Sequence, residues 1–287
     1  MVLALPEDML SGMADVRDRA PAAPVAVQAT SAQVAAVTAT LAGAHRPLVV
    51  VGGPHWSGDA ARALVRFAEG WGLPVAVSFR RQDRMDNDHA NYVGDLGVGM
   101  NPRLAARLQA ADVILAIGTR MGDIATGGYE LLDPACPHAR LIHIHADAGE
   151  LNRVFPADPG IALPAPAMLE ALAGTVAPND RPWLGWARDA RAEYEAWQVP
   201  KATPGAVRME DVVGWLATNL PHDAIVTNGA GNYAAFLHRY FRFRQTGTQL
   251  APTSGSMGYG FPASIAASLA HPGRMVVCLA GDGCFQM

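Results

Sequence analysis

The stretch Met275-Val276-Val277-Cys278-Leu279-Ala280-Gly281-Asp282-Gly283 decides the fold of the C-terminal part of this chain. Its first six residues form an unbroken apolar run, which predicts a buried strand. Asp282 then stands at the carboxyl edge of a sheet between two residues without side chains, so a bulky ligand can approach it closely. Cofactors of α/β proteins bind at that edge. One carboxylate beside a diphosphate would suit Mg²⁺, which prefers oxygen ligands.

Apolar strands alternate with helical patterns along most of the chain, and strands of this kind are typical of parallel sheets covered on both faces. In the first half, the pattern predicts strands over 48–52, 74–79, 113–118 and 141–145 and helices over 32–42, 59–71, 102–110 and 166–176. A helix over 183–197 follows. A second unit contains predicted strands over 224–228 and 275–280 and helices over 209–220, 230–241 and 258–270. We therefore expect an α/β protein with two doubly wound, parallel-sheet domains.

Composition excludes several classes of function. The 287 residues are 50% hydrophobic and 17% charged, with a net charge of −4, which gives ample core material and no basic surface for nucleic acid. No apolar run reaches the ~20 residues of a membrane helix, and the N-terminus lacks a secretory signal pattern. The three cysteines, Cys136, Cys278 and Cys284, lack the spacing of a zinc site or disulfide framework. A cytoplasmic protein is expected.

Two motifs carry a resemblance to a known family. Gly255-Ser256-Met257-Gly258-Tyr259-Gly260-Phe261-Pro262-Ala263, followed by Gly281-Asp282-Gly283-Cys284-Phe285-Gln286-Met287, resembles the acetolactate synthase-like family of thiamine diphosphate (ThDP) enzymes. Full members have a pyrimidine-binding, a central and a diphosphate-binding domain. The resemblance implies a remnant of the pyrimidine domain over 1–13, a linker over 14–30, a Rossmann-like central domain over 31–178, a helical linker over 179–206 and the first half of the diphosphate domain over 207–287.

The resemblance also implies roles for residues near the C-terminus. Asp282 would bind Mg²⁺ under the cofactor's diphosphate, and Met257 would lie between the two cofactor rings. The other residues implied to contact the cofactor are Asn228, Gly229, Gly255, Ser256, Gly281, Gly283 and Cys284. Each has a simpler explanation: Asp282 could cap a helix, Met257 could fill a core, and Asn228-Gly229 could be an ordinary turn.

FAD is a further cofactor to consider, because flavin-containing members of the family bind it in the central domain. Gly52, Gly53, Arg120 and Asp147 stand at positions that could take this role. Two departures from the family pattern argue against it: Phe79-Arg80-Arg81-Gln82-Asp83 lacks a Gly-Lys-Gly, and His145 stands where Asp is usual. His143 and His145 alternate along a strand and so face the same side, which makes a pair of metal ligands conceivable. No third ligand is evident, so a packing role within the strand is favoured.

Two further interpretations concern charged side chains. His238 lies within a helical stretch beside Arg239, which favours a surface or packing role over a catalytic one. The mixed charges of residues 80–88 are typical of a loop exposed to solvent.

The function implied by the resemblance is decarboxylation of a 2-keto acid such as pyruvate, followed by ligation of the remaining unit to a second carbonyl. The alternatives are a 2-keto acid or oxalyl-CoA-type decarboxylase and, in another class, a non-catalytic nucleotide-binding or interaction module. The glutamate that activates the cofactor would lie in the upstream domain, so no catalytic residue is expected here, and the polypeptide alone is expected to be inactive. The resemblance implies a homodimer or homotetramer of the intact protein.

Overall fold

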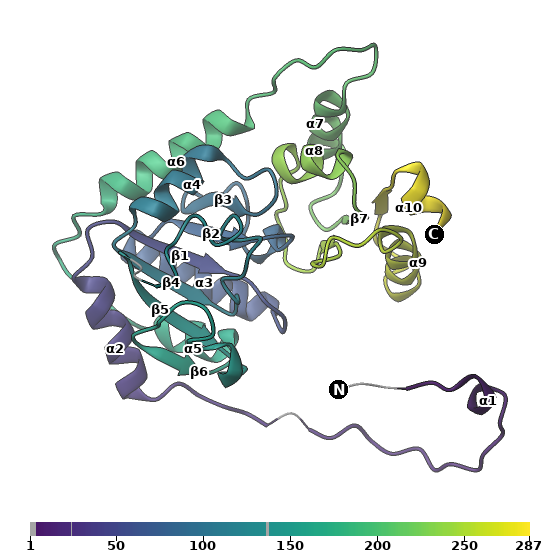
Figure 1. Ribbon diagram of the computed structural model, residues 1–287, viewed down its shortest axis with the longest axis horizontal. Helices are drawn as coiled ribbons and strands as arrows, with labels where there is room; N and C mark the ends of the chain where they lie inside the picture. Colours follow the sequence, from purple (N-terminus) through teal and green to yellow (C-terminus); the bar gives the residue numbers. More distant parts are fainter. Residues whose placement is uncertain (1–3, 24, 136–137) are drawn as a thin grey trace.

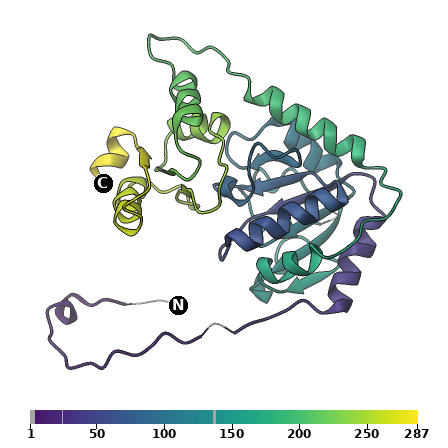
Figure 2. The ribbon, with the colours of Figure 1, turned by 180° about the vertical axis from the view of Figure 1, so that it is seen from behind.

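The computed structural model describes residues 4–23, 25–135 and 138–287. Val2, Leu3 and Cys136 lie outside the described residues. The N-terminal segment extends away from the rest of the chain (Figures 1 and 2), and residues 4–23 are all exposed. The apolar pattern within residues 1–10 predicts a short strand that ends at Pro6. This prediction is wrong for its described part, because Ala4 and Leu5 are irregular and only the short helix α1 (Glu7–Leu10) follows. No described strand lies beside this segment, so its backbone groups have no partner for a sheet.

Six parallel strands of the described residues form the central sheet in the order β3-β2-β1-β4-β5-β6 (Figure 1). The order reverses between β1 and β4, which creates the crevice where doubly wound folds bind ligands. The predicted strands are confirmed as β1, β2, β4 and β5, whereas β3 and β6 were not predicted. The strands are β1 (Pro47–Val51), β2 (Val75–Ser78), β3 (Tyr92–Leu96), β4 (Val113–Ile117), β5 (Arg140–His145) and β6 (Gly160–Ala162).

Helices cover both faces of this sheet because the side chains of its strands alternate between two cores. Val49 and Val51 pack with α2, α3 and α5 on one face, while Leu48 and Val50 pack with α4 and α6 on the other (Figures 1 and 2). The elements around the sheet are α2 (Ser31–Ala42), α3 (Gly58–Trp71), α4 (Pro102–Ala110), α5 (Ala165–Leu172), α6 (Leu184–Gln198) and the short 3₁₀ helices η1 (Gln82–Arg84) and η2 (Ala148–Glu150).

The sequence predicts a helix cap at Ser57 or Asp59 and a helix start at Asn101-Pro102, and the structure confirms a start at Ser57 and at Asn101. The Ser57 hydroxyl accepts a hydrogen bond from the Ala60 amide at the start of α3. Asn101 accepts one from Arg103 at the start of α4, where Pro102 occupies the first turn. By contrast, α5 ends at Leu172 and not at the predicted residue 176. The chain turns there because the Thr175 hydroxyl donates to the Leu172 carbonyl and accepts from Trp71 Nε1.

A smaller parallel sheet follows in the order β8-β7-β9. Helices α7 and α8 lie on one side of this sheet and α9 on the other (Figure 1). Val226 on β7 packs with α7 and α8, and on the α9 side the Thr227 hydroxyl donates to the Gly260 carbonyl. The two-residue strand β8 was not predicted. The elements are α7 (Met209–Asn219), β7 (Ile225–Asn228), α8 (Tyr233–Tyr240), β8 (Gln249–Leu250), α9 (Gly260–Ala270), β9 (Val276–Leu279) and α10 (Asp282–Gln286).

A pair of tryptophans fastens the linker helix α6 to the central domain. Trp71 and Trp183 are buried and stacked, with ring centroids 6.5 Å apart. Trp183 Nε1 donates to the Trp71 carbonyl at 2.9 Å. Both indoles therefore combine a large buried apolar area with a satisfied N–H group.

Replacing Trp183 by alanine tests this contact. We expect Trp183→Ala to lower the free energy of unfolding of the central domain by about 3–5 kcal/mol, because a large buried side chain is removed and a cavity is left. Urea denaturation followed by circular dichroism measures the change. The matched control is Trp215→Ala, since the Trp215 side chain is 62% exposed. A Trp183→Ala protein as stable as that control would contradict the packing described.

Candidate functional site

The carboxyl ends of β7 and β9 bring two predicted site segments together. These strands are parallel neighbours, with Asn228 paired to Leu279. The Gly229 amide donates to the Leu279 carbonyl at 3.4 Å, so the turn after β7 lies beside the turn after β9. The second turn contains Gly281, Asp282 and Gly283. Two segments more than fifty residues apart in the sequence thus form one edge, because parallel strands point the same way.

A third segment, Gly255–Gly258, reaches the same edge. A Cβ atom added to Gly283 would lie 2.9 Å from the Met257 Cε methyl, so this methyl lies against the Gly-Asp-Gly turn. Met257 is still 45% exposed, which leaves one side of it open. Gly255 has a φ of +74° and open space around it. The structure therefore brings Met257 and the turn that carries Asp282 side by side.

Asp282 does not cap a helix. Gly281 occupies the cap position of α10, and no side chain accepts a hydrogen bond there. Asp282 is exposed, and its carboxylate forms no hydrogen bond or ion pair with the residues that the structure describes. The helix-capping alternative is thus absent from the structure. The same described residues contain no cluster of three or more His, Cys, Asp or Glu side chains that could hold a metal on their own.

Buried polar side chains lie beside these turns at the carboxyl edge of the smaller sheet. The Asn228 side chain donates to the Gly229 carbonyl at 2.7 Å, but its own Oδ1 is buried without a partner among the described residues. The Tyr233 hydroxyl is likewise buried and unpartnered there. Burial, with the Cys284 thiol beside it, raises the pKa of Tyr233 to about 12, so the hydroxyl stays neutral. Cys284 is buried, and its thiol donates to the Ala230 carbonyl at 3.0 Å.

The residues considered for FAD lie at the carboxyl edge of the central sheet. Gly53 and Arg120 line a cavity of about 430 Å³, together with Arg81, Gly118 and His145. Gly52 and Asp147 do not line it. A Cβ on Gly52 would lie 2.0 Å from Ser78 Oγ, which explains this glycine by close packing. Asp147 instead accepts a hydrogen bond from the Gly149 amide at the start of η2, and Arg120 pairs with Glu150.

The histidines considered as ligands or bases have packing roles in the structure. His143 is buried, and its Nε2 lies 2.8 Å from the Thr119 carbonyl, to which it donates. Burial lowers the pKa of His143. His238 is also buried, with its ring edge against Phe79. Burial and the charge of Arg80 lower the pKa of His238 to about 3, so the imidazole is neutral at pH 7.

The expectation of a solvated loop over residues 80–88 is wrong. Arg80, Gln82, Asp83 and Asn87 are all buried, because this loop packs against the second domain. The Asn87 side chain and backbone exchange two hydrogen bonds with the backbone of Phe243. We call the contacts of residues 79–88 with residues 229–252 the interdomain seam. Sequence reasoning missed it because charged residues are seldom buried without partners, and the carbonyls that bind Arg80 lie more than 140 residues away in the sequence.

Comparison with known proteins agrees with this geometry. The family described as thiamine pyrophosphate enzyme, central domain, matches residues 34–172, and the thiamine pyrophosphate enzyme, C-terminal TPP binding domain, matches residues 229–287. A structure titled as the Rhodococcus jostii RHA1 thiamine diphosphate-dependent 4-hydroxybenzoylformate decarboxylase is similar, with a TM-score of 0.70 and 27% identity over 93% of this chain and 49% of that one. These matches define the class: the chain is part of the thiamine diphosphate enzymes.

Relatives narrow the family. The acetolactate synthase of Mycobacterium bovis is 28% identical over 100% of this chain and 48% of its own length. The acetolactate synthase large subunit of Parasynechococcus marenigrum is 31% identical over 89% of this chain and 41% of its own length. The large subunit of acetolactate synthase isozyme 2 from Escherichia coli is 28% identical over 89% of this chain and 46% of its own length. The chain belongs to the acetolactate synthase-like family of thiamine diphosphate enzymes. It spans about half the length of the curated relatives it matches.

Gly260 offers a test of how closely α9 approaches the site. A Cβ on this residue would lie 2.6 Å from backbone atoms of Asn228 and Gly229, and backbone cannot yield as a flexible side chain does. We expect Gly260→Ala to lower the melting temperature and to shift the NMR signals of the turn after β7. Gly214→Ala, in helix α7 with open space around it, should be neutral or stabilising by up to about 1 kcal/mol. Equal effects of the two substitutions would refute the close approach.

Proposed function

We propose that this chain supplies the diphosphate-binding turns of an enzyme that uses ThDP and Mg²⁺ to decarboxylate a 2-keto acid and to ligate the product to a second carbonyl compound. The observation that carries this proposal is the position of the Met257 methyl against the Gly281-Asp282-Gly283 turn, where the Asp282 carboxylate is exposed and unpaired among the described residues. The relatives named acetolactate synthase support this choice of reaction.

The residues present fit such a cofactor. Asp282 would provide one oxygen ligand to Mg²⁺. Met257 offers an apolar, half-exposed side chain around which the cofactor could fold so that its two rings lie on either side. Gly255 would bring its backbone close to an aminopyrimidine. Gly229, Ser256, Gly283 and Cys284 would line the diphosphate, and the orphaned Asn228 Oδ1 and Tyr233 hydroxyl would gain polar partners. When bound, the cofactor supplies a carbon nucleophile and an electron sink.

A decarboxylase without ligation is the second candidate, favoured by the similarity to the 4-hydroxybenzoylformate decarboxylase structure. In that case an aromatic 2-keto acid would give an aldehyde, whereas pyruvate would give acetolactate under our first proposal. Analysis of the products that the intact enzyme forms from each acid separates the two.

We also infer a cytoplasmic homo-oligomer, of two or four subunits, and the domain boundaries given above. No helix in the described part of the chain could span a membrane.

Replacing Asp282 by asparagine tests the metal role. We expect the 287-residue polypeptide to bind ThDP with Mg²⁺ more weakly than micromolar, because one carboxylate holds this strongly hydrated ion poorly. At excess ligand, Asp282→Asn should abolish the Mg²⁺-dependent part of the binding measured by isothermal titration calorimetry. The matched control is Asp180→Asn at an exposed position far along the chain. An Asp282→Asn variant that binds Mg²⁺ and ThDP as the unmodified chain does would exclude the role of Asp282.

A nucleotide such as FAD is the alternative for the central domain, because Arg81 and Arg120 line the 430 Å³ cavity. We expect the purified chain to carry no flavin, since Asp147 and Arg120 already have protein partners and Gly52 is explained by packing. The visible absorbance spectrum of the purified protein checks this. A stoichiometric flavin spectrum would contradict the expectation and would favour a nucleotide-binding central domain.

A further inference from the structure

Arg80 has an unusual environment for a charged residue. Its side chain is only 4% exposed, and its backbone adopts a left-handed conformation with a φ of 56°. No carboxylate of the described residues pairs with its guanidinium, which instead donates from Nη1 to the Pro252 carbonyl at 2.6 Å and from Nη2 to the Gly229 carbonyl at 3.2 Å. A buried charge without a counterion and a non-glycine residue at positive φ are both costly, and such costs concentrate at functional positions.

The two carbonyls belong to different turns of the site. The Pro252 carbonyl also accepts the Gly255 amide at 3.0 Å and so closes the turn that leads to Met257. The Gly229 carbonyl also accepts the Asn228 side chain at 2.7 Å and so belongs to the turn after β7. One guanidinium from the central domain thus connects two turns of the diphosphate domain. The planar fork of arginine can donate to both at once, which a single ammonium group cannot do with the same geometry.

We propose that Arg80 is a positioning residue that fixes the turn at Gly229 relative to the turn at Gly255, so that the central domain sets the geometry of the site in its neighbour. Phe79 supports this arrangement, since the Arg80 guanidinium lies 4.7 Å from the centre of its ring while His238 packs against the same ring. The importance of this geometry for ThDP rests on the function proposed above. The contact itself does not depend on it.

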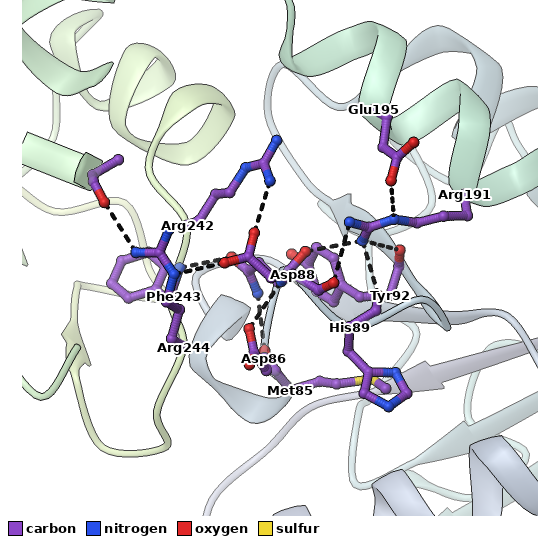
Figure 3. A network of polar contacts seen from close by, with 12 residues as sticks. Met85, Asp86, Asp88, His89, Tyr92, Arg191, Glu195, Arg242, Phe243 and Arg244 are labelled. Carbon is purple, nitrogen blue, oxygen red and sulfur yellow. Dashed lines mark hydrogen bonds and ion pairs between the residues drawn. The ribbon is translucent and has the colours of Figure 1, made fainter. Parts of the chain in front are cut away.

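The remainder of the interdomain seam holds the domains together without Arg80. Gln82 and Gln249 exchange two hydrogen bonds. The backbone N–H of Gln82 donates to Gln249 Oε1, and Gln249 Nε2 donates to Gln82 Oε1. Figure 3 shows the outer part, where Asp88 pairs with Arg242 and Arg244 while Arg191 of α6 donates to backbone carbonyls of the same loop. These contacts touch neither Gly229 nor Pro252. The loss of Arg80 should therefore loosen two turns without separating the domains.

Hydrogen–deuterium exchange of the ligand-free chain tests the proposal. In Arg80→Met, both carbonyls keep their second donor, so the protein should fold. Exchange at the Gly255 amide and in the turn after β7 should rise about tenfold, because hydrogen bonds from a charged donor are lost. In Arg80→Lys, the single ammonium group should keep amide exchange slow in one turn and leave exchange fast in the other. Arg242→Met removes an arginine of the same seam and is the matched control, with both turns expected to remain slow.

Two outcomes would overturn the proposal: unchanged exchange in Arg80→Met, or equal acceleration in Arg80→Met and Arg242→Met, which would show general loosening of the seam. Exchange with excess ThDP and Mg²⁺ is measured in parallel on the unmodified chain. If the ligands protect neither turn, the proposed function fails, while the ligand-free comparison still decides the role of Arg80. If they protect both turns in the unmodified chain and less in Arg80→Met, both inferences stand.

Discussion

The parallel pairing of β7 with β9 is the constraint on which the site depends. The turns that follow parallel strands all lie at one edge of the sheet. The register that pairs Asn228 with Leu279 places the glycine-rich turns after β7 and β9 next to each other at that edge. The third segment joins them because Gly260 allows α9 to approach the backbone of β7. The site is therefore formed by backbone positions, with few side chains, which suits a ligand that is held mainly through its phosphates and rings.

The interdomain seam adds a second constraint from outside that sheet. Reciprocal amide contacts between Gln82 and Gln249 and the double contact of Asn87 with Phe243 are specific in direction and buried, so they fix one relative placement of the loop and the second domain. Arg80 extends this rigidity to the turns of the site. The central domain thus has a structural role that does not require it to bind a nucleotide.

The sequence predicted those parts of the fold whose physics is local. β1 and β4 are unbroken apolar runs, and the start of α4 has both an Asn cap and a proline in its first turn. β3 was missed because its Tyr-Val-Gly-Asp-Leu sequence contains two poor strand formers, and β8 because two residues form no pattern. The motifs around Met257 and Asp282 indicated candidate residues through resemblance. Arg80 could not be found, because its role depends on carbonyls of residues distant in sequence.

We propose that the Met257 methyl and the Asp282 turn together receive the folded cofactor. The most direct measurement is methyl NMR of the chain labelled with ¹³C at its methionine methyl groups, with the Met257 signal assigned from Met257→Leu. ThDP with Mg²⁺ should move the Met257 signal upfield, because the methyl would lie between two aromatic rings, and ThDP without Mg²⁺ should move it less. A Met257 signal that stays in place while saturating ThDP and Mg²⁺ shift other methionines would contradict the claim.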